Sequence, residues 1–503
     1  MENLQKHIGK LINQLRDKQG MTQAELAEKI GTTQSAIARM ENGEQNISTE
    51  MLANISEALQ KPLIQLPNGS LNFKIEGGHK LSGTVAIKTS KNGAVGLLCA
   101  SLLNRNTTLL KNVPKIEEVN RIIEVLQSIG VSVKWTDNDL EINPPKKLDL
   151  NKINVESAIK TRSIIMLIGP LIHWAKSFKL PQAGGCKLGS RTVKPHFFAL
   201  EKMGVDIKTT SNNYEITTEK LSAGEIVLYE SGDTVTENAI MAASLIPGKT
   251  TIKFASANYQ VQDLCFFLKG LGIEIDGIGT TTLTIHGVKE INQKTTYYLS
   301  EDPIEAMFFL AVAIVTKSSI TIERCPIAFL ELELLKLEKM GFKYKITKKY
   351  KAHNGQTDLV DIKTMPSKLV ALEEKIESRP YPGLNIDNLP FFAVIATQAE
   401  GQTFIHDWVY EKRAIYYKEL DKLGADTLLA DPHRIYINGV TELKANEVIC
   451  PPALRPAVII LIGMLGAKGT SLLRNVYSIN RGYEDLANRL NKLGAKITLL
   501  KDF

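Results

Sequence analysis

Residues 200–208 read LEKMGVDIK, and nearly the same letters return at residues 337–345 as LEKMGFKYK. In both stretches the last apolar residue of a helical pattern is followed directly by glycine and then by a short strand-like run. A glycine at that place is typical of a helix C-cap that turns the chain into the strand. The same pattern begins at four other leucines, which are Leu126, Leu268, Leu420 and Leu490.

The six junctions form a repeat. Their glycines follow one another at intervals of roughly 70 residues, which is the self-similarity of a repeat architecture. Chance explains two copies of such a common junction, but it does not explain six. The sequence therefore predicts an α/β (α+β) fold of six βα units after a linker, LPNGSLNF. The glycines are Gly130, Gly204, Gly272, Gly341, Gly424 and Gly494.

Length and composition limit the class of protein. With 503 residues the chain is too long for one hydrophobic core and predicts two or three domains. No apolar run approaches the roughly 18 residues that span a bilayer, and the first residues lack the apolar core of a signal peptide. We therefore expect a cytoplasmic protein without a membrane partner. The net charge of +7 permits an anionic partner but does not require one.

The five cysteines are scattered, odd in number and without CxxC spacing. This pattern argues against a disulfide framework and against a zinc site, and we expect neither a metal nor a cofactor. Cys186 stands apart, because it lies between glycines and a lysine in PQAGGCKLGSR. The other four lie in or beside apolar runs and are expected to be inert: Cys99, Cys265, Cys325 and Cys450.

Residues 1–66 predict a separate, small all-α domain. Thr22 and Glu25 form the pattern of a capping box at the start of a second helix. A third helix follows, with Ile37 and Met40 facing inward. Short helices joined by a tight glycine-containing turn are typical of a helix-turn-helix.

The stretch MTQAELAEKIGTTQSAIARMENG closely resembles the phage-repressor (XRE-type) helix-turn-helix family. The resemblance implies that the third helix enters the major groove of DNA, so that residues 1–66 bind DNA. It also implies an internal ion pair between Arg16 and Glu41. A helix-turn-helix used for protein contacts or dimerisation is the alternative. The implied DNA contacts are Gln34, Ser35 and Arg39 on the third helix, and Gln23, beside a phosphate, on the second.

The sixfold repeat, together with the motif TSKNGAV and the loop of Cys186, resembles the enolpyruvyl transferase family over residues 71–503. The match favours the branch that uses UDP-N-acetylglucosamine in peptidoglycan synthesis over the 3-phosphoshikimate branch. The resemblance implies two lobes of three repeats each, with helices inside and sheets outside, an inside-out α/β barrel. The expected segments are the helix-turn-helix domain at 1–66, a linker with the first strands of the second lobe at 67–90, the first lobe at 91–280 and the second lobe at 281–503.

That family transfers the enolpyruvyl group of phosphoenolpyruvate to a sugar hydroxyl. Phosphoenolpyruvate carries a carboxylate and a phosphate, so its site needs several cations. By motif, the resemblance implies Lys91, Asp387 and Cys186 as catalytic residues: a lysine for phosphoenolpyruvate, a carboxylate beside the reacting hydroxyl, and a thiol on a mobile loop. The implied substrate-binding residues are Asn92, Arg162, Arg191, Arg413 and Arg455.

Three positions depart from the family pattern on the acceptor side. Asn258 stands where a glutamate that contacts the sugar is expected, Lys194 replaces an aspartate, and Ala453 removes an acid beside Arg455. Phosphoenolpyruvate chemistry is thus expected to be intact, while acceptor recognition is altered. The expected partners are phosphoenolpyruvate and UDP-N-acetylglucosamine or a related nucleotide sugar.

Two questions stay open from the sequence. Asp387 precedes the helical run NLPFFAVIAT and is also a good N-cap residue. For the whole chain, the alternatives are an enolpyruvyl transferase for a different nucleotide sugar, or a transcription regulator that uses the two lobes as a ligand sensor.

Overall fold

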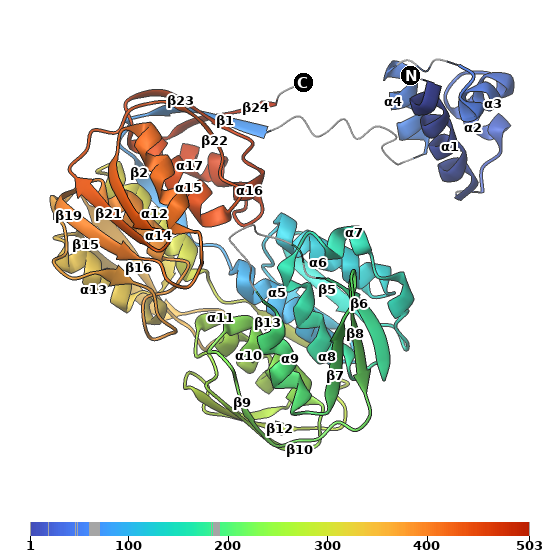
Figure 1. The fold of residues 1–503 in the computed structure, drawn as a ribbon, viewed down its shortest axis with the longest axis horizontal. Helices are drawn as coiled ribbons and strands as arrows, with labels where there is room; N and C mark the ends of the chain where they lie inside the picture. Colours follow the sequence, from blue (N-terminus) through green and yellow to red (C-terminus); the bar gives the residue numbers. More distant parts are fainter. Residues whose placement is uncertain are drawn as a thin grey trace. The chain divides into compact units, whose positions relative to one another are not determined.

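The computed structural model describes residues 2–18, 20–45, 47, 49–59, 71–182, 184 and 192–501. The chain divides into two compact units (Figure 1), an N-terminal unit of residues 1–71 with 501–503 and a large unit of residues 72–500. The expected end of the first domain at residue 66 lies outside the described residues. Each unit is described by itself.

The N-terminal unit is all helical, as the sequence predicts. Thr22 caps the second helix by accepting the N–H of Glu25, and the Glu25 carboxylate accepts the N–H of Thr22, which completes the predicted capping box. Ile37 and Met40 are buried in the core of the unit. The described helices are α1 (Glu2–Lys18), α2 (Gln23–Lys29), α3 (Gln34–Asn42) and α4 (Thr49–Ala58).

A buried ion pair joins the first and third helices of this unit. Arg16 Nε donates to Glu41 Oε1 at 2.6 Å, and Nη2 donates to Oε2 at 3.1 Å. Both side chains are at least nine-tenths buried. Asn13 and Gln23 also donate to this carboxylate, each at 2.8 Å. The ion pair that the resemblance implied is therefore confirmed, and Arg16 is a structural residue.

The first lobe of the large unit runs from α5 to β13 and carries three sheets around buried helices. Its sheets have the strand orders β13-β3-β5-β4, β6-β8-β7 and β11-β12-β10-β9. The strands are β3 (Thr108–Lys111), β4 (Ser132–Thr136), β5 (Asp139–Asn143), β6 (Ser177–Pro181), β7 (Val205–Thr209), β8 (Asn213–Thr218), β9 (Glu225–Val227), β10 (Gly248–Lys253), β11 (Glu274–Asp276), β12 (Thr282–Gly287) and β13 (Thr295–Tyr298). The helices are α5 (Lys91–Ala100), η1 (Ser101–Leu103), α6 (Glu117–Ser128), η2 (Leu150–Lys152), α7 (Val155–Ala158), η3 (Arg162–Leu167), α8 (Ile168–Leu171), α9 (Lys194–Glu201), α10 (Asp233–Ser244) and α11 (Tyr259–Gly270).

The second lobe contains the first two strands of the large unit and everything from α12 to β24. Its sheets have the orders β15-β16-β14-β2, β17-β19-β21-β20 with β18 beside β19, and β22-β23-β1-β24. The strands are β1 (Leu71–Gly77), β2 (Ser82–Ala86), β14 (Ser319–Pro326), β15 (Lys343–Lys351), β16 (Asp358–Met365), β17 (Leu369–Val370), β18 (Ile376–Glu377), β19 (Ala399–His406), β20 (Asp426–Asp431), β21 (Arg434–Gly439), β22 (Glu447–Ile449), β23 (Gly469–Arg474) and β24 (Lys496–Lys501). The helices are α12 (Pro303–Val315), η4 (Ile327–Phe329), α13 (Glu331–Lys339), α14 (Leu389–Ala396), η5 (Ala414–Leu423), α15 (Leu454–Gly466), α16 (Tyr477–Asn480) and α17 (Leu486–Lys492).

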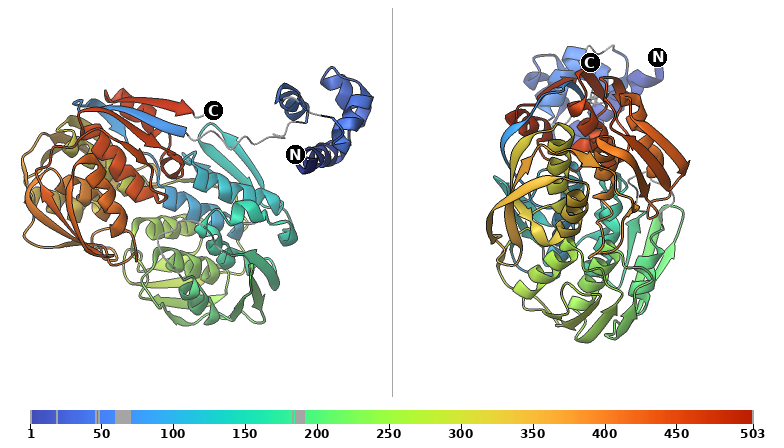
Figure 2. Two further views of the ribbon diagram at one scale, coloured as in Figure 1. Left: turned by 45° about the horizontal axis from the view of Figure 1, so that its top comes forward. Right: turned by 90° about the vertical axis from the view of Figure 1, so that its left-hand side faces the viewer.

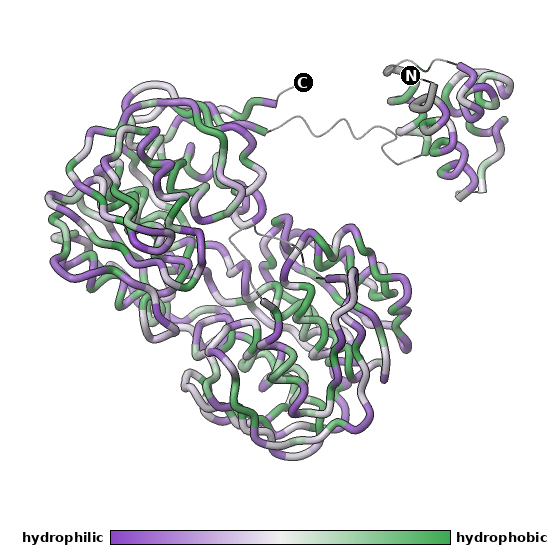
Figure 3. The backbone as a smooth tube through the Cα atoms, viewed as in Figure 1, coloured by the Kyte–Doolittle hydropathy of each residue, from purple (hydrophilic) through white to green (hydrophobic). Residues whose placement is uncertain are grey.

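Helices lie inside each lobe and sheets lie outside (Figures 1 and 2), which confirms the inside-out arrangement. In the second lobe α12, α14 and α15 pack against one another. Every residue of α12, PIEAMFFLAVAIV, is buried, and so is every residue of α14. A helix that is apolar on all sides is stable only inside a core, which explains their place (Figure 3).

The repeated glycines follow helices and precede strands in all six units. Each has a positive φ, from +86° at Gly424 to +100° at Gly130 and Gly494. Only glycine adopts this conformation without steric cost, so it reverses the chain from the helix into the first strand of the hairpin. The repeat that the sequence predicted is therefore confirmed.

The expected boundary between the lobes at 280/281 is wrong. Strand β12 pairs antiparallel with β10, and β13 pairs parallel with β3, so both belong to sheets of the first lobe. In contrast, β2 pairs with β14 in the second lobe, as expected. Residues 281–298 were misplaced because their partners in the sheets lie up to 187 positions earlier, as for Tyr298 and Lys111, which the repeat period does not reveal.

Two segments carry the described chain between the lobes, residues 87–90 outward and residues 299–302 on return. They lie side by side. Ser90 N–H donates to Ser300 O at 2.8 Å, Asp302 N–H donates to Lys88 O at 2.9 Å, and Thr89 forms a β-bridge with Glu301. The described part of the chain contains no helix that is both long and apolar enough to cross a membrane.

Candidate active site between the two lobes

A cavity of about 750 Å³ lies between the lobes. Both lobes line it, and it brings together every described residue that the sequence nominated for the reaction. Cys186 and Arg191 lie outside the described residues, so the structure places neither of them. The residues brought together are Lys91, Asn92, Arg162, Asp387, Arg413 and Arg455.

Lys91 and Asn92 are the first two residues of α5 and follow directly on a segment that crosses between the lobes. Ser90 caps this helix, because its Oγ accepts the N–H of Gly93 at 3.0 Å. Ser90 Oγ and Asn92 Nδ2 each donate to the hydroxyl of Tyr259 at 3.2 Å. The start of α5 is thus tied to the start of α11, which fixes both cavity residues.

Asp387 lies among three cations. Its Oδ2 accepts from Arg455 Nη2 at 3.2 Å, and its Oδ1 lies 3.9 Å from Arg413 Nη1. Burial opposes ionisation of this carboxyl, but the charges of Arg455, Arg413 and Lys91 outweigh it and hold its pKa below the ordinary value. Asp387 is therefore a carboxylate at neutral pH.

The suggestion that Asp387 caps a helix is wrong. The N-cap of α14 is Asn388, and no side chain caps that helix. The Asp387 carboxylate points at Arg455 instead, because an ion pair with a buried guanidinium is worth more than a hydrogen bond to one backbone N–H.

Arg413 is held in one orientation by a buried partner. Its Nε donates to Asp407 Oδ2 at 2.6 Å, and its Nη2 donates to Asp407 Oδ1 at 2.9 Å and to Ile386 O at 2.8 Å. The Tyr417 hydroxyl donates to the same carboxylate at 2.6 Å. Nη1 is left as a buried donor without a hydrogen-bond partner in the structure. A donor left in this state at the edge of a cavity is suited to an anionic ligand.

Arg162 and His196 line the cavity on the side of the first lobe. Arg162 Nη2 donates to Thr192 O at 2.8 Å. His196 packs behind it, with Nδ1 at 3.1 Å from Asn238 Nδ2. Burial and the charge of Arg162 lower the pKa of His196 to about 3, so its ring is neutral. His196 is therefore a structural support of this wall, not a proton donor.

Sequence reasoning missed a further arginine, Arg481, which lines the same cavity. Its Nη2 donates to Glu118 Oε2 at 2.9 Å. Burial opposes ionisation of Glu118, but the charges of Lys91 and Arg481 hold its pKa below the ordinary value. The sequence signal that could have identified Arg481 is its charge in the irregular stretch before the last helix of the repeat.

Two acids of α10 were missed as well. Asp233 and Glu237 line the cavity. Burial, with Asp233 and Asp263 nearby, raises the pKa of Glu237 well above its ordinary value. The signal was present in DTVTENAIMAAS, where acidic residues interrupt a run of small and apolar residues.

The three departures from the family pattern have different surroundings. Asn258 lines the cavity and caps α11, with Oδ1 accepting the N–H of Tyr259 at 2.9 Å. Lys194 is exposed at the start of α9 and is absent from the cavity lining. Ala453 is buried at the N-cap of α15, directly before the cavity residues Leu454 and Arg455.

The expected inert cysteines are buried and free: Cys99, Cys265, Cys325 and Cys450. Burial raises the pKa of all four thiols, that of Cys265 and of Cys450 to about 12. They are therefore thiols rather than thiolates at neutral pH.

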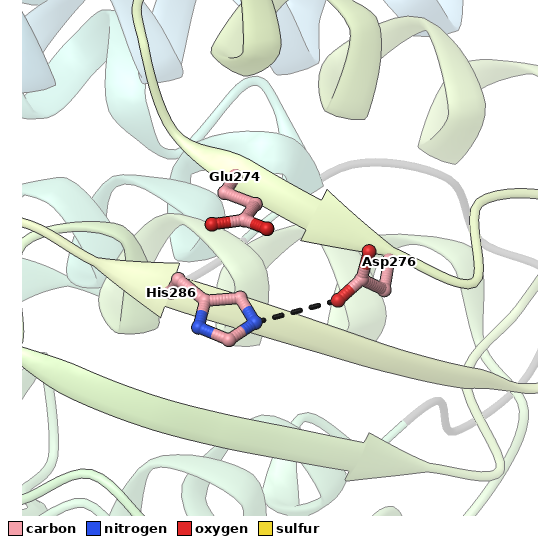
Figure 4. A group of neighbouring side chains, drawn as sticks. All are labelled: Glu274, Asp276 and His286. Carbon is pink, nitrogen blue, oxygen red and sulfur yellow. Dashed lines mark hydrogen bonds and ion pairs between the residues drawn. The ribbon is translucent and has the colours of Figure 1, made fainter.

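One group of potential metal ligands occurs among the described residues (Figure 4). Glu274 and Asp276 on β11 face His286 on β12, whose Nε2 lies 3.3 Å from Asp276 Oδ2. The two acids are exposed and His286 is only partly covered, so all three side chains are accessible to solvent. We assign no function to this group.

The N-terminal unit carries three of the four expected DNA-contacting residues on α3 and the fourth, Gln23, on α2. Gln34 and Ser35 are the first two residues of α3, and they are exposed together with Arg39. Gln23 is half-buried, and its Nε2 donates to Glu41.

Comparison with known families gives two matches. Residues 75–490 match the family of EPSP synthase (3-phosphoshikimate 1-carboxyvinyltransferase), and residues 12–66 match a helix-turn-helix family. A UDP-N-acetylglucosamine 1-carboxyvinyltransferase of Treponema denticola is 34% identical over 430 residues, which cover 85% of this chain and 99% of that protein. The protein of the same name in Borreliella burgdorferi is 32% identical and covers 86% of this chain and 99% of its own length.

Solved structures share the fold of the large unit. The enolpyruvyl transferase NikO from Streptomyces tendae superimposes with a TM-score of 0.74 at 22% identity, covering 86% of this chain and 99% of NikO. An EPSP synthase from Acinetobacter baumannii gives a TM-score of 0.68 at 18% identity, covering 86% of this chain and all of that one.

Proposed function

The chain belongs to the EPSP synthase family of enolpyruvyl transferases, and on that basis we propose that it transfers the enolpyruvyl group of phosphoenolpyruvate to the 3′-hydroxyl of UDP-N-acetylglucosamine, releasing phosphate in the cytoplasm. The observation that carries this proposal is the cluster of cations around Asp387 in the cavity between the lobes. The curated relatives named after this reaction match over nearly their whole length.

The cations suit a ligand with two anionic groups. Phosphoenolpyruvate offers a carboxylate and a phosphate, which guanidinium groups bind through paired hydrogen bonds. Arg413 contributes an Nη1 that has no hydrogen-bond partner in the structure, while Arg455 and Arg481 are oriented by Asp387 and Glu118. Lys91 adds a point charge at the start of α5.

Asp387 is the proposed base. The acceptor hydroxyl would give its proton to this carboxylate while its oxygen bonds to C2 of phosphoenolpyruvate and C3 gains a proton from the Cys186 thiol. Release of phosphate then breaks the bond between C2 and the phosphate oxygen, and C3 returns a proton to restore the double bond. The atoms balance without a cofactor.

The charge of the first substrate adjusts this base. With the cavity empty, the cations hold the pKa of Asp387 low, which makes the carboxylate a weak base. Anionic phosphoenolpyruvate beside Arg455, Arg413 and Lys91 offsets their charge and raises that pKa toward neutrality. The base is thereby strengthened only when the enolpyruvyl donor is bound.

Phosphate release measured with phosphoenolpyruvate and UDP-N-acetylglucosamine tests the proposal directly. A panel of other nucleotide sugars distinguishes a changed acceptor from a dead enzyme. Tight binding of both ligands without phosphate release would instead support the alternative of a ligand-sensing regulator.

We propose DNA binding as the function of the N-terminal unit, supported by the family match at residues 12–66 and by the exposure of Gln34, Ser35 and Arg39. Fluorescence anisotropy with the full chain and DNA selected from a random pool tests it. Q34A is expected to weaken binding, and Q14A, which removes an exposed glutamine from α1, serves as the matched control. Equal affinity of both variants for the selected DNA counts against the assignment.

A further inference from the structure

Asp233 stands on the wall of the cavity that the first lobe supplies. It is the first residue of α10, directly after Gly232, and its side chain is half-buried and lines the cavity. It therefore presents a carboxylate to the same space as Asp387, but from the opposite lobe.

Three neutral donors fix this carboxylate. Ser256 Oγ donates to Oδ1 at 2.5 Å, while Asn258 Nδ2 and Gln260 Nε2 donate to Oδ2 at 3.0 and 2.9 Å. A carboxylate offers about four acceptor positions, so one position is left for a ligand. All three donors come from one short segment, Ser256–Gln260, whose sequence is SANYQ.

The same wall holds further buried acceptors without partners. Gln260 and Glu237 are each more than nine-tenths buried and both line the cavity. Gln260 Oε1 and Glu237 Oε1 have no hydrogen-bond partner in the structure. Unpaired buried acceptors are costly, and a ligand that brings donors removes part of that cost.

The two walls differ in charge. Asp387 faces Arg413 and Arg455, whereas Asp233 faces neutral amides and a hydroxyl. Asp233 and Asp387 line the same cavity, and burial together with the charge of Asp387 raises the pKa of Asp233. An anionic group is therefore favoured beside Asp387 and disfavoured beside Asp233.

We infer that Asp233, with Gln260 and Glu237, forms the subsite that receives a hydrogen-bond donor of the sugar, a hydroxyl or an amide N–H, and thereby selects the acceptor. This inference rests on the proposed function, because Asp233 lines the same cavity as the proposed base, Asp387. Asn258 caps α11 with Oδ1 and donates to Asp233 through Nδ2. Asp233 of α10 therefore supplies the acid that is absent at position 258.

The variant D233N removes the charge of the subsite and keeps a side chain of the same shape in place. Asparagine keeps the shape, and rotation of the Gln260 amide lets the free Oε1 accept from the new amide group, so the variant is expected to fold. Isothermal titration calorimetry with the full chain should show affinity for UDP-N-acetylglucosamine lowered about tenfold or more, and affinity for UDP changed less than about twofold. The exposed D276N on β11 is the matched control and should change neither.

A second variant tests whether the charge itself matters. N258D retains an N-cap for α11 and places an acid beside Asp233. The double variant D233N/N258D should therefore bind UDP-N-acetylglucosamine several-fold more tightly than D233N alone. Unchanged sugar affinity in D233N, an equal loss for UDP, or no binding by the wild type would overturn the inference. Absence of phosphate release with this binding pattern intact would reject the proposed reaction but not the subsite.

Discussion

Asp387 and Arg455, which are 68 positions apart in the chain, form a hydrogen-bonded ion pair of 3.2 Å on the wall of the cavity between the lobes. Arg455 is fixed in turn, because its Nη1 donates to the Tyr483 hydroxyl at 3.0 Å. The guanidinium thus both orients the carboxylate and lowers its pKa. If one partner is lost, the other is left as a buried charge without a counter-ion.

R455M is expected to lower kcat/KM for phosphoenolpyruvate by about a hundredfold or more, because a charge-assisted contact is lost in a buried site. The pKa of Asp387 should rise when this cation is removed, so the acidic limb of the pH profile should move to higher pH. Phosphate release measured from pH 5 to 9 gives both kcat/KM and the position of the acidic limb. R434M removes an exposed arginine from β21 and should change neither. The expected drop in kcat/KM with an unshifted pH limb would argue that Arg455 only binds substrate.

Cys186 is expected to be the thiol alkylated by the epoxide fosfomycin, which forms a carbon–sulfur bond as the ring opens. The four other cysteines are buried, and their raised pKa values keep them protonated, so they should not compete. Intact-mass and peptide mass spectrometry should find one adduct in the wild type and none in C186S. An adduct on a buried cysteine would contradict both the assignment and the burial.

Asp302 links stability to pH. It caps α12 through the N–H groups of Ile304 and Glu305, and burial with the charge of Glu305 raises its pKa to about 6. Between about pH 4 and pH 6 the folded chain holds a proton that the unfolded chain has lost, so the free energy of unfolding from this group falls as pH rises, by up to about 3 kcal/mol.

D302N keeps a good N-cap and removes this titration. Compared with the wild type, the variant should therefore gain relative stability between pH 4 and pH 7. Urea midpoints measured at four pH values check the difference. Parallel pH curves for the two proteins would show that Asp302 does not titrate in this range.

Glu41 holds the N-terminal unit together through Arg16, Asn13 and Gln23. E41Q leaves the buried Arg16 with the exposed Asp17 as its ionic partner and removes the buried one, so it should cost about 3 kcal/mol in the free energy of unfolding of this unit. Limited proteolysis should show faster cleavage of residues 1–59, with phosphate release by the large unit unchanged. E28Q, at an exposed position of α2, is the matched control. Equal cleavage rates for the two variants would contradict a stabilising role.

The sequence was sufficient to predict those features that depend on neighbouring residues or on a repeated pattern. The capping box at Thr22 and Glu25 and the six helix-to-strand glycines depend on neighbouring residues, and both were predicted correctly. Six residues that line the cavity were nominated through motifs. Each of these six described residues stands at or beside the start of a helix.

What the sequence did not reveal depends on contacts between distant segments. The pairing of β13 with β3 and the contact of Asp233 with Ser256 and Gln260 arise only when repeats pack together. Arg481 joins Glu118 across 363 positions of the chain. The capping role suggested for Asp387 failed for the same reason, since its stronger partner, Arg455, is not a neighbour in sequence.

The two paired segments between the lobes form one two-stranded connection. Because residues 87–90 and 299–302 are hydrogen-bonded to each other, a change in the angle between the lobes would bend both segments together. Lys91 directly follows residues 87–90, and α12 begins at Pro303, directly after residues 299–302. Such a change would move Lys91, which the proposed reaction assigns to phosphoenolpyruvate, relative to Asp387, so that binding of the donor and assembly of the reacting groups would depend on the same movement.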